Sequence, residues 1–183
     1  MHTHVQARSL RAIALLSLRI SLAVLLLSLS AKITVSLPNT PVPITFQVLA
    51  VLLLGLSLGS REATLSVSAY LAAILSGFPW DARGLGAAAF ASPTAGYLLA
   101  FLPAAALAGF GRGRSTWLAF AICCAAVLIV YMGGAAVMFS YVGSWERAIA
   151  LGVAPFILAD FGKALLAVAL VRLGRAVGFR WLL

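Results

Sequence analysis

The chain has 183 residues, of which 63% are hydrophobic and only 9% are charged, against about 25% charged residues in an average soluble domain. A soluble domain of this size could not hide so much apolar surface, so we expect lipid to cover much of the protein. The length allows about six membrane spans of roughly 20 residues each, and it leaves no room for a nucleotide-binding domain. The composition therefore predicts one compact membrane domain.

The net charge of +9 comes from 13 basic residues and four acids. The acids are Glu62, Asp81, Glu146 and Asp160. A basic soluble protein would suggest a nucleic-acid ligand. Here the basic residues stand singly or in pairs between apolar runs, so we attribute them to membrane topology and expect no nucleic-acid partner. Cys123 and Cys124 are adjacent in an apolar run and are expected to be packing residues, since no zinc-like spacing exists.

Apolar runs predict six transmembrane helices in chain order. They cover residues 12–31, 44–58, 63–77, 93–110, 116–139 and 155–173. The first run imitates a secretory signal peptide, but it is too long for the apolar core of such a signal. The second and third runs extend only about 23 Å each, less than the hydrocarbon core of about 30 Å. They are short spans, which we favour, or a re-entrant hairpin.

The segments between these runs carry prolines, glycines and charges. Segments 34–43, 78–91 and 140–153 are therefore predicted to be irregular, with a tight turn at 59–62. The chain is therefore predicted to consist of an N-terminal tail at 1–11, a six-helix domain at 12–174 and a basic tail at 175–183. No internal repeat or linker indicates a second domain.

The distribution of Lys and Arg predicts the direction of the spans. With six spans, one side of the membrane holds both termini and the second and fourth connections. Its basic residues are Arg8, Arg11, Arg61, Arg112, Arg114, Arg172, Arg175 and Arg180. The other side holds Lys32, Arg83 and Arg147. Because cytoplasmic loops are enriched in Lys and Arg, both termini are predicted to be cytoplasmic.

The three spans predicted to run inward each open with a proline, namely Pro43, Pro93 and Pro155. Polar residues follow each proline within about two turns. They are Thr45 and Gln47, Thr94 and Tyr97, and Asp160 and Lys163. Positive helix ends favour anions, so this pattern indicates a ligand site on the outer side. The alternative is that the prolines mark helix starts and the polar residues lie at the headgroup level.

Asp160 and Lys163 are three residues apart, so they share a helix face and can pair. Charges at membrane depth normally face a bundle or a polar cavity. The pair therefore offers an acceptor and a cationic donor to a polar solute, or it is a buried ion pair that fixes helix packing. Arg19 lies near the start of the first span and is expected to be an interfacial anchor. No set of residues typical of an enzyme, a metal site or a cofactor site is present, so we expect none of these.

Aromatic residues near the outer ends of the spans, such as Trp80 and Tyr97, are typical of an interfacial belt. Trp80 lies in the Pro- and Gly-rich third connection and could also close over a ligand. Tyr70 is deeper in its span and is a candidate pocket residue.

Four segments resemble one known family. They are PVPITFQVLAVL at 41–52, GFP at 77–79, SPTAGY at 92–97, and PF at 155–156 followed by Asp160 and Lys163. In this order, over about residues 12–174, they resemble the BioY family, the biotin-specific substrate-binding S-components of energy-coupling-factor (ECF) transporters. The sequence departs from the family pattern at Ala95, where the family has Gly, and at Trp80–Arg83, where small residues are expected.

The resemblance implies six membrane helices in the cytoplasmic (inner) membrane of a prokaryote, with a vitamin pocket near the extracellular side that loops cover. It also implies a transmembrane coupling protein and two ATPase subunits as partners. Ser17 and Ser21 stand where such proteins carry an Ala-xxx-Ala surface for the coupling protein, and this small-xxx-small pair permits close helix approach.

Biotin's chemistry suits the candidate residues. Its ureido N–H groups need acceptors, which Asp160 and Gln47 offer. Its ureido oxygen or carboxylate needs donors, for which the candidates are Lys163, Thr94, Tyr97 and Arg83. Thr45 lies close to Gln47 in the sequence. Tyr70 and Trp80 are candidates for the pocket wall that contacts the rings of biotin. The alternatives are an S-component for another vitamin or small solute, and a structural membrane subunit in which the Asp160–Lys163 pair only packs helices.

Overall fold

The computed structural model describes residues 2–178, with side chains from residue 10 onward. This part of the chain is mostly helical, with seven α-helices, two short 3-10 helices and one two-stranded sheet. The α-helices are α1 (His2–Lys32), α2 (Gln47–Leu58), α3 (Ser60–Leu75), α4 (Ala95–Gly109), α5 (Thr116–Val142), α6 (Trp145–Gly152) and α7 (Ile157–Ala176). The remaining elements are β1 (Thr34–Val35), β2 (Ile44–Thr45), η1 (Gly86–Ala91) and η2 (Ala154–Phe156).

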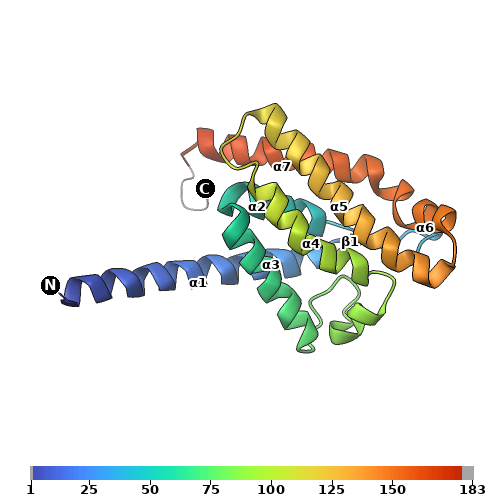
Figure 1. The fold of residues 1–183 in the computed structure, drawn as a ribbon, viewed down its shortest axis with the longest axis horizontal. Helices are drawn as coiled ribbons and strands as arrows, with labels where there is room; N and C mark the ends of the chain where they lie inside the picture. Colours follow the sequence, from blue (N-terminus) through green and yellow to red (C-terminus); the bar gives the residue numbers. More distant parts are fainter. Residues whose placement is uncertain (1, 179–183) are drawn as a thin grey trace.

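The helices form one bundle, and its two ends carry different elements (Figure 1). Helix α4 packs against α5, α2 and α3, while α7 lies against α2 and α5. Helix α1 packs along α3 and extends beyond the bundle (Figure 1). The start of α1 and the end of α7 lie at the left end in this view, and the strands and α6 lie at the right end. Helix α1 therefore begins, and helix α7 ends, on the same side of the bundle.

The surface of the bundle is apolar. Three stretches are long and apolar enough to cross a membrane, namely Leu10–Lys32, Thr116–Val142 and Trp145–Ala176. The shorter helices α2 and α4 are also apolar. Large side chains such as Trp117 and Leu158 are 80% and 89% exposed, which suits contact with lipid rather than water. The protein is therefore a multi-pass membrane protein.

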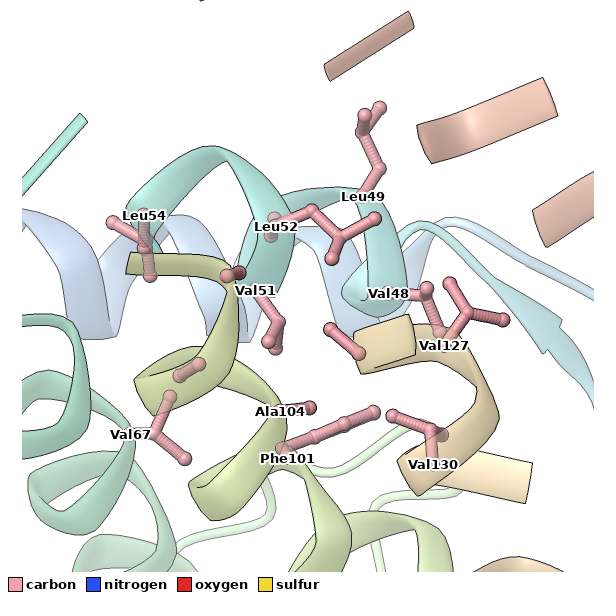
Figure 2. Close-up of a cluster of buried hydrophobic side chains, with 14 of the residues drawn as sticks. Val48, Leu49, Val51, Leu52, Leu54, Val67, Phe101, Ala104, Val127 and Val130 are labelled. Atoms are coloured by element: carbon pink, nitrogen blue, oxygen red, sulfur yellow. The ribbon is translucent and has the colours of Figure 1, made fainter. Parts of the chain in front are cut away.

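Helix α2 lies at the centre of the bundle and is buried on nearly all sides. A helix that is apolar all round is typical of such a position. Its side chains meet those of α3, α4 and α5, as Figure 2 shows. The residues drawn there include Val48, Leu49, Val51, Leu52, Leu54, Val67, Phe101, Ala104, Val127 and Val130. This core holds α2 so that its N-terminal residue, Gln47, has a defined place.

Each of the six predicted spans corresponds to one of the helices α1 to α5 and α7, but all three segments that were predicted to be irregular contain regular structure. Segment 140–153 is not a loop, because α5 continues to Val142 and α6 follows. Gly143, with φ of 69°, ends α5, and the Ser144 hydroxyl accepts a hydrogen bond from the Arg147 amide at 3.5 Å to start α6. A serine N-cap of this kind can start even a short helix.

The other two segments that were predicted to be irregular also differ in part from that prediction. In segment 34–43, β1 pairs antiparallel with β2, and in segment 78–91 the last six residues form η1. The turn expected at 59–62 consists of Gly59 alone, with φ of 82°, before α3 begins.

The expectation that Pro43, Pro93 and Pro155 open three long helices is wrong in detail. Helix α2 begins four residues after Pro43, and α4 begins two residues after Pro93. Only Pro155 occupies a first helical turn, and that turn belongs to η2. The strand β2 and a turn occupy the intervening residues instead.

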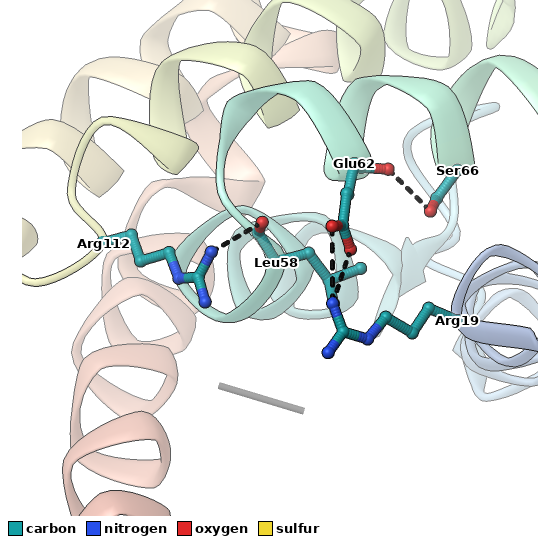
Figure 3. A network of polar contacts seen from close by, with 5 residues as sticks. All are labelled: Arg19, Leu58, Glu62, Ser66 and Arg112. Atoms are coloured by element: carbon teal, nitrogen blue, oxygen red, sulfur yellow. Dashed lines mark hydrogen bonds and ion pairs between the residues drawn. The ribbon is translucent and has the colours of Figure 1, made fainter. Parts of the chain in front are cut away.

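Arg19 does not act only as an interfacial anchor. Its guanidinium forms an ion pair with Glu62 of α3 at 3.3 Å, and the Glu62 carbonyl accepts a hydrogen bond from the Ser66 hydroxyl at 2.8 Å. Nearby, Arg112 donates to the carbonyl of Leu58 at 3.1 Å, where α2 ends (Figure 3). These contacts tie α1 to α3 and stabilise the turn between α2 and α3.

Helices α4 and α5 approach closely through glycines. A Cβ atom built on Gly96 would collide with the main-chain oxygen of Gly133 and would lie 2.9 Å from the Val137 side chain. Overpacking of this kind typically costs about 1–3 kcal/mol. We expect Gly96→Ala to lower the Tm of detergent-purified protein by several degrees.

Gly162→Ala of α7 is the matched control, since a Cβ there meets nothing within 4 Å. Alanine favours a helix over glycine by up to about 1 kcal/mol, so its Tm should stay the same or rise slightly. Equal Tm values for the two variants would contradict close packing at Gly96.

Candidate ligand-binding site

A cavity opens at the end of the bundle that carries the strands and α6. Its empty volume, including the space that opens to solvent, is about 590 Å³. Its polar lining comes from the β2–α2 segment, the loop after α3, the middle of α5, and the starts of α4 and α7. The lining residues are Val42, Pro43, Ile44, Thr45, Gln47, Val48, Asp81, Ala82, Thr94, Tyr97, Leu98, Phe101, Val130, Tyr131, Phe156, Asp160 and Lys163.

The expected pairing of Asp160 with Lys163 is confirmed. The Lys163 ammonium donates to Asp160 Oδ1 at 2.6 Å, and the Tyr131 hydroxyl of α5 donates to Oδ2 at 3.0 Å. Asp160 and Lys163 are only 4% and 9% exposed. Each carboxylate oxygen thus has one partner and retains capacity for another, and the ammonium retains donors. The pair can therefore hold a ligand that carries both donors and acceptors.

A second polar group lies at the start of α2. The Gln47 amide nitrogen of the main chain donates to the Thr45 hydroxyl oxygen at 3.2 Å, which positions the first turn. The Gln47 side chain donates through Nε2 to the Tyr70 hydroxyl at 2.8 Å. Tyr70, which is fully buried, in turn donates to the Trp80 carbonyl at 3.0 Å. This chain of hydrogen bonds fixes the Gln47 side chain. Its carbonyl oxygen Oε1 accepts from the Thr45 hydroxyl at 3.4 Å and retains capacity for one further donor.

Asp81 supplies a further carboxylate to the cavity wall, and it is only 3% exposed. Its two oxygens accept hydrogen bonds from the main-chain amides of Gly86 at 2.8 Å and Arg83 at 3.0 Å. These bonds fold the loop after α3 around Asp81, as short acidic side chains commonly do in turns. Asp81 therefore shapes the wall of the cavity at this point.

Thr94 and Tyr97 complete the polar lining at the start of α4. The Thr94 hydroxyl lies 2.8 Å from the Ser92 hydroxyl. The Tyr97 hydroxyl donates to the Gly152 carbonyl at the end of α6 at 2.6 Å. Its ring lies directly against Gly134 of α5, where a Cβ would collide with ring atoms. Tyr97 thus links α4, α5 and α6 while it faces the cavity.

The structure brings together six of the nine residues that the sequence indicated as ligand contacts. Thr45, Gln47, Thr94, Tyr97, Asp160 and Lys163 line the cavity. The other three lie outside its lining. Tyr70 lies behind Gln47, and Arg83 is exposed beside Ala82. Trp80 lines a different, apolar groove together with residues of α1.

Ser17 and Ser21 are both exposed on α1, and Ser21 lines the same groove as Trp80.

Two further polar side chains line the cavity, Asp81 and Tyr131, and neither was predicted from the sequence. Tyr131 is a single polar aromatic in the middle of a 27-residue apolar helix, which is the signal that could have indicated it. For Asp81 the signal was a carboxylate in a Pro- and Gly-rich connection. The apolar wall was not predicted, because residues such as Phe101 and Val130 resemble ordinary core positions.

An open cavity with converging polar groups in a membrane helix bundle is typical of a protein that binds a small polar solute. The sequence matches the BioY family over residues 1–178, and the chain belongs to this family.

Relatives and a solved structure agree with this assignment. The chain is 39% identical over 150 residues to a probable biotin transporter BioY of Pyrococcus horikoshii, covering 81% of this chain and 89% of that protein. It is 34% identical to the biotin transporter BioY of Thermotoga maritima, covering 73% and 80% of the two chains. Its fold matches the crystal structure of the S-component for biotin from an ECF-type ABC transporter with a TM-score of 0.81 and 26% identity, covering 91% and 93%. These similarities are to transporters, not to enzymes.

The hydrogen bonds of Tyr70 predict its contribution to stability. Tyr70→Phe leaves Gln47 Nε2 without its acceptor and the Trp80 carbonyl without its donor, and such buried groups typically cost about 1–3 kcal/mol when unsatisfied. We expect a lower Tm for ligand-free protein. Tyr141→Phe is the matched control, because the Tyr141 hydroxyl donates to the Ala91 carbonyl at 2.7 Å in an exposed position. A Tyr70→Phe Tm equal to that of the control would contradict the buried network.

Proposed function

We propose that the protein captures biotin with high affinity and takes it up across the cytoplasmic membrane, as the S-component of an ECF-type ABC transporter. The observation that carries this proposal is the Asp160–Lys163 pair in the wall of an open cavity. It offers an anionic acceptor beside a cationic donor in an apolar protein, and relatives of the chain are named biotin transporters.

In this proposal α1, α2, α3, α4, α5 and α7 are the six spans, and α6 lies at the outer surface. Both termini are cytoplasmic, with basic tails at 1–11 and 175–183. Support comes from the common end of the bundle at which α1 begins and α7 ends (Figure 1) and from the excess of arginine at that end. Arg180 lies outside the described residues. The cavity lies at the other end and thus faces the outside of a prokaryotic cell.

The proposed ligand contacts follow from the chemistry of the side chains. Asp160 accepts from a ureido N–H group, and Lys163 donates to the ureido oxygen or to the carboxylate. Gln47 Oε1 is a second acceptor, with Thr45 and Thr94 as neighbouring hydroxyls.

The remaining candidates act less directly in this proposal. Tyr97 offers mainly its ring, because its hydroxyl already donates to Gly152. Tyr70 acts through Gln47, and Trp80 acts through the position of its loop. Arg83, which is exposed next to the cavity wall, is a donor for the ligand carboxylate.

The energy for uptake comes from partner subunits in this proposal. A transmembrane coupling protein and two ATPase subunits supply it, and the support is the match of the fold to the S-component of an ECF-type ABC transporter. Ser17 and Ser21, which are exposed on α1, form the surface for the coupling protein. Small side chains four residues apart allow a partner helix to approach closely.

Labelled biotin should bind saturably to the detergent-purified protein at nanomolar concentrations. We expect Asp160→Ala and Lys163→Ala to raise the Kd by at least about 30-fold, because truncating one member of a buried charge pair typically costs about 2–5 kcal/mol. Equilibrium binding measures the Kd, and size-exclusion chromatography checks that the variants are folded.

Glu146→Ala and Arg147→Ala are matched controls, because both side chains are exposed at the same end of the bundle. They should bind as the wild type does. No binding by folded wild type would overturn the biotin assignment, and a panel of other vitamins would then identify the solute. Wild-type affinity in both cavity variants would overturn the site.

Exchange of Ser17 and Ser21 for leucine tests the docking surface. The bulky side chains should prevent close helix approach, so uptake in cells that contain the other transporter subunits should fall about tenfold or more. Binding of biotin by the purified variant should stay unchanged. Ser140→Leu, at an exposed serine of α5, is the control. Normal uptake by the Ser17 and Ser21 variant would contradict docking at this surface.

A further inference from the structure

Lys32, the last residue of α1, joins that helix to the loop that forms part of the cavity wall. Its ammonium donates to the main-chain carbonyls of Pro79 at 2.7 Å and Asp81 at 2.9 Å. We define the pocket loop as residues 78–86, between α3 and the start of η1. Lys32 is thus separated by 47 and 49 residues from the two carbonyls that it contacts. The contact is a tertiary link and not a local helix cap.

Three successive carbonyls of the pocket loop are held by side chains of other elements. Lys32 of α1 binds those of Pro79 and Asp81, and the Tyr70 hydroxyl of α3 binds the one between them, at Trp80. An irregular segment has no ladder of main-chain partners, so its carbonyls need such donors. Bonds from a charged donor are stronger than neutral ones. Lys32 and Tyr70 therefore hold the loop between α1 and α3.

The position of this loop determines one wall of the cavity. Asp81 and Ala82 line the cavity, and the Asp81 carbonyl is one of the two oxygens that Lys32 binds. The Asp81 carboxylate bonds to amides within the loop, at Arg83 and Gly86, so it shapes the loop but does not attach it to α1. The attachment to α1 comes from the Lys32 ammonium.

We propose that Lys32 is a positioning residue that clamps the pocket loop against α1 and thereby slows the escape of a bound ligand. Lys32 itself does not line the cavity. It acts through Asp81 and Ala82, the two loop residues that do. The effect on ligand escape rests on the proposed function, whereas the effect on the loop does not.

A different role for an exposed lysine at a helix end is to reach the membrane interface and anchor the helix there. An anchoring lysine would affect the position of α1 but not the pocket loop. The two roles therefore differ in which amides become less protected when the ammonium is removed. Some main-chain amides of the pocket loop donate hydrogen bonds within the loop, such as the Gly84 amide to the Asp81 carbonyl at 3.2 Å. The exchange rates of these amides report how well the loop is ordered.

The test is hydrogen exchange of the ligand-free, full-length protein in detergent, measured by mass spectrometry. Lys32→Met retains much of the apolar stem and removes the ammonium. We expect amides of residues 80–86 to exchange about tenfold faster in this variant, with the amides of α4 and α5 unchanged. Lys32→Arg should restore most of the protection, because a guanidinium also donates to carbonyls. Arg147→Met, an exposed cation at the same end, is the control and should exchange as the wild type does.

The same variants also test the ligand effect. Labelled biotin should dissociate about three- to tenfold faster from Lys32→Met, while its association rate changes little. If the wild type binds no biotin, the proposed function fails, and the exchange data still decide the role of Lys32 in holding the loop. Unchanged exchange in residues 80–86, or equally faster exchange in all helices, would overturn the clamp. A wild-type dissociation rate in Lys32→Met would overturn its effect on ligand escape.

Discussion

The structure depends on how two opposite charges are kept within an apolar helix bundle. Moving an unpaired ion out of water costs several kcal/mol, and a buried pair needs good geometry and further hydrogen bonds to offset this cost. Asp160 has both, through the ammonium of Lys163 and the hydroxyl of Tyr131. Because the pair lies in the wall of an open cavity rather than in the packed core, its unused donors and acceptors face a space that a solute can enter.

The same constraint explains the polar contacts elsewhere in the bundle. Carbonyls at helix ends and in loops lack partners within a helix, so those that the protein shields from water need donors from other parts of the chain. Side chains supply them at several places: Tyr97 to Gly152, Arg112 to Leu58, and Tyr70 to Trp80. The first two contacts join residues 55 and 54 positions apart, and the third joins α3 to the loop that follows it. Tyr97 and Tyr70 therefore both satisfy main-chain carbonyls and help to build the cavity, because Tyr97 lines it and Tyr70 holds Gln47 in its wall.

Much of the helical architecture could be predicted from the sequence, because long apolar runs and the prolines and glycines between them are local signals. Helix α6 and the strand pair could not be. Helix α6 depends on the Ser144 cap and on the stacking of Trp145 against Phe139, with ring centroids 4.5 Å apart. The ion pair between Arg19 and Glu62 was also missed, because it joins residues 43 positions apart. Pairing at such separations depends on which helices become neighbours.

The sequence by itself determined that the protein is an apolar, helical membrane protein, and it indicated Asp160 and Lys163 as the central pair. Both conclusions follow from composition and from spacing along one helix, which need no knowledge of neighbours. Only the tertiary structure decided which other residues share the cavity. It places Asp81 and Tyr131 in the wall and Tyr70 behind it. The physical reason is that a side chain's surroundings depend on the packing of α2, α4, α5 and α7 around it, and no local pattern records that packing.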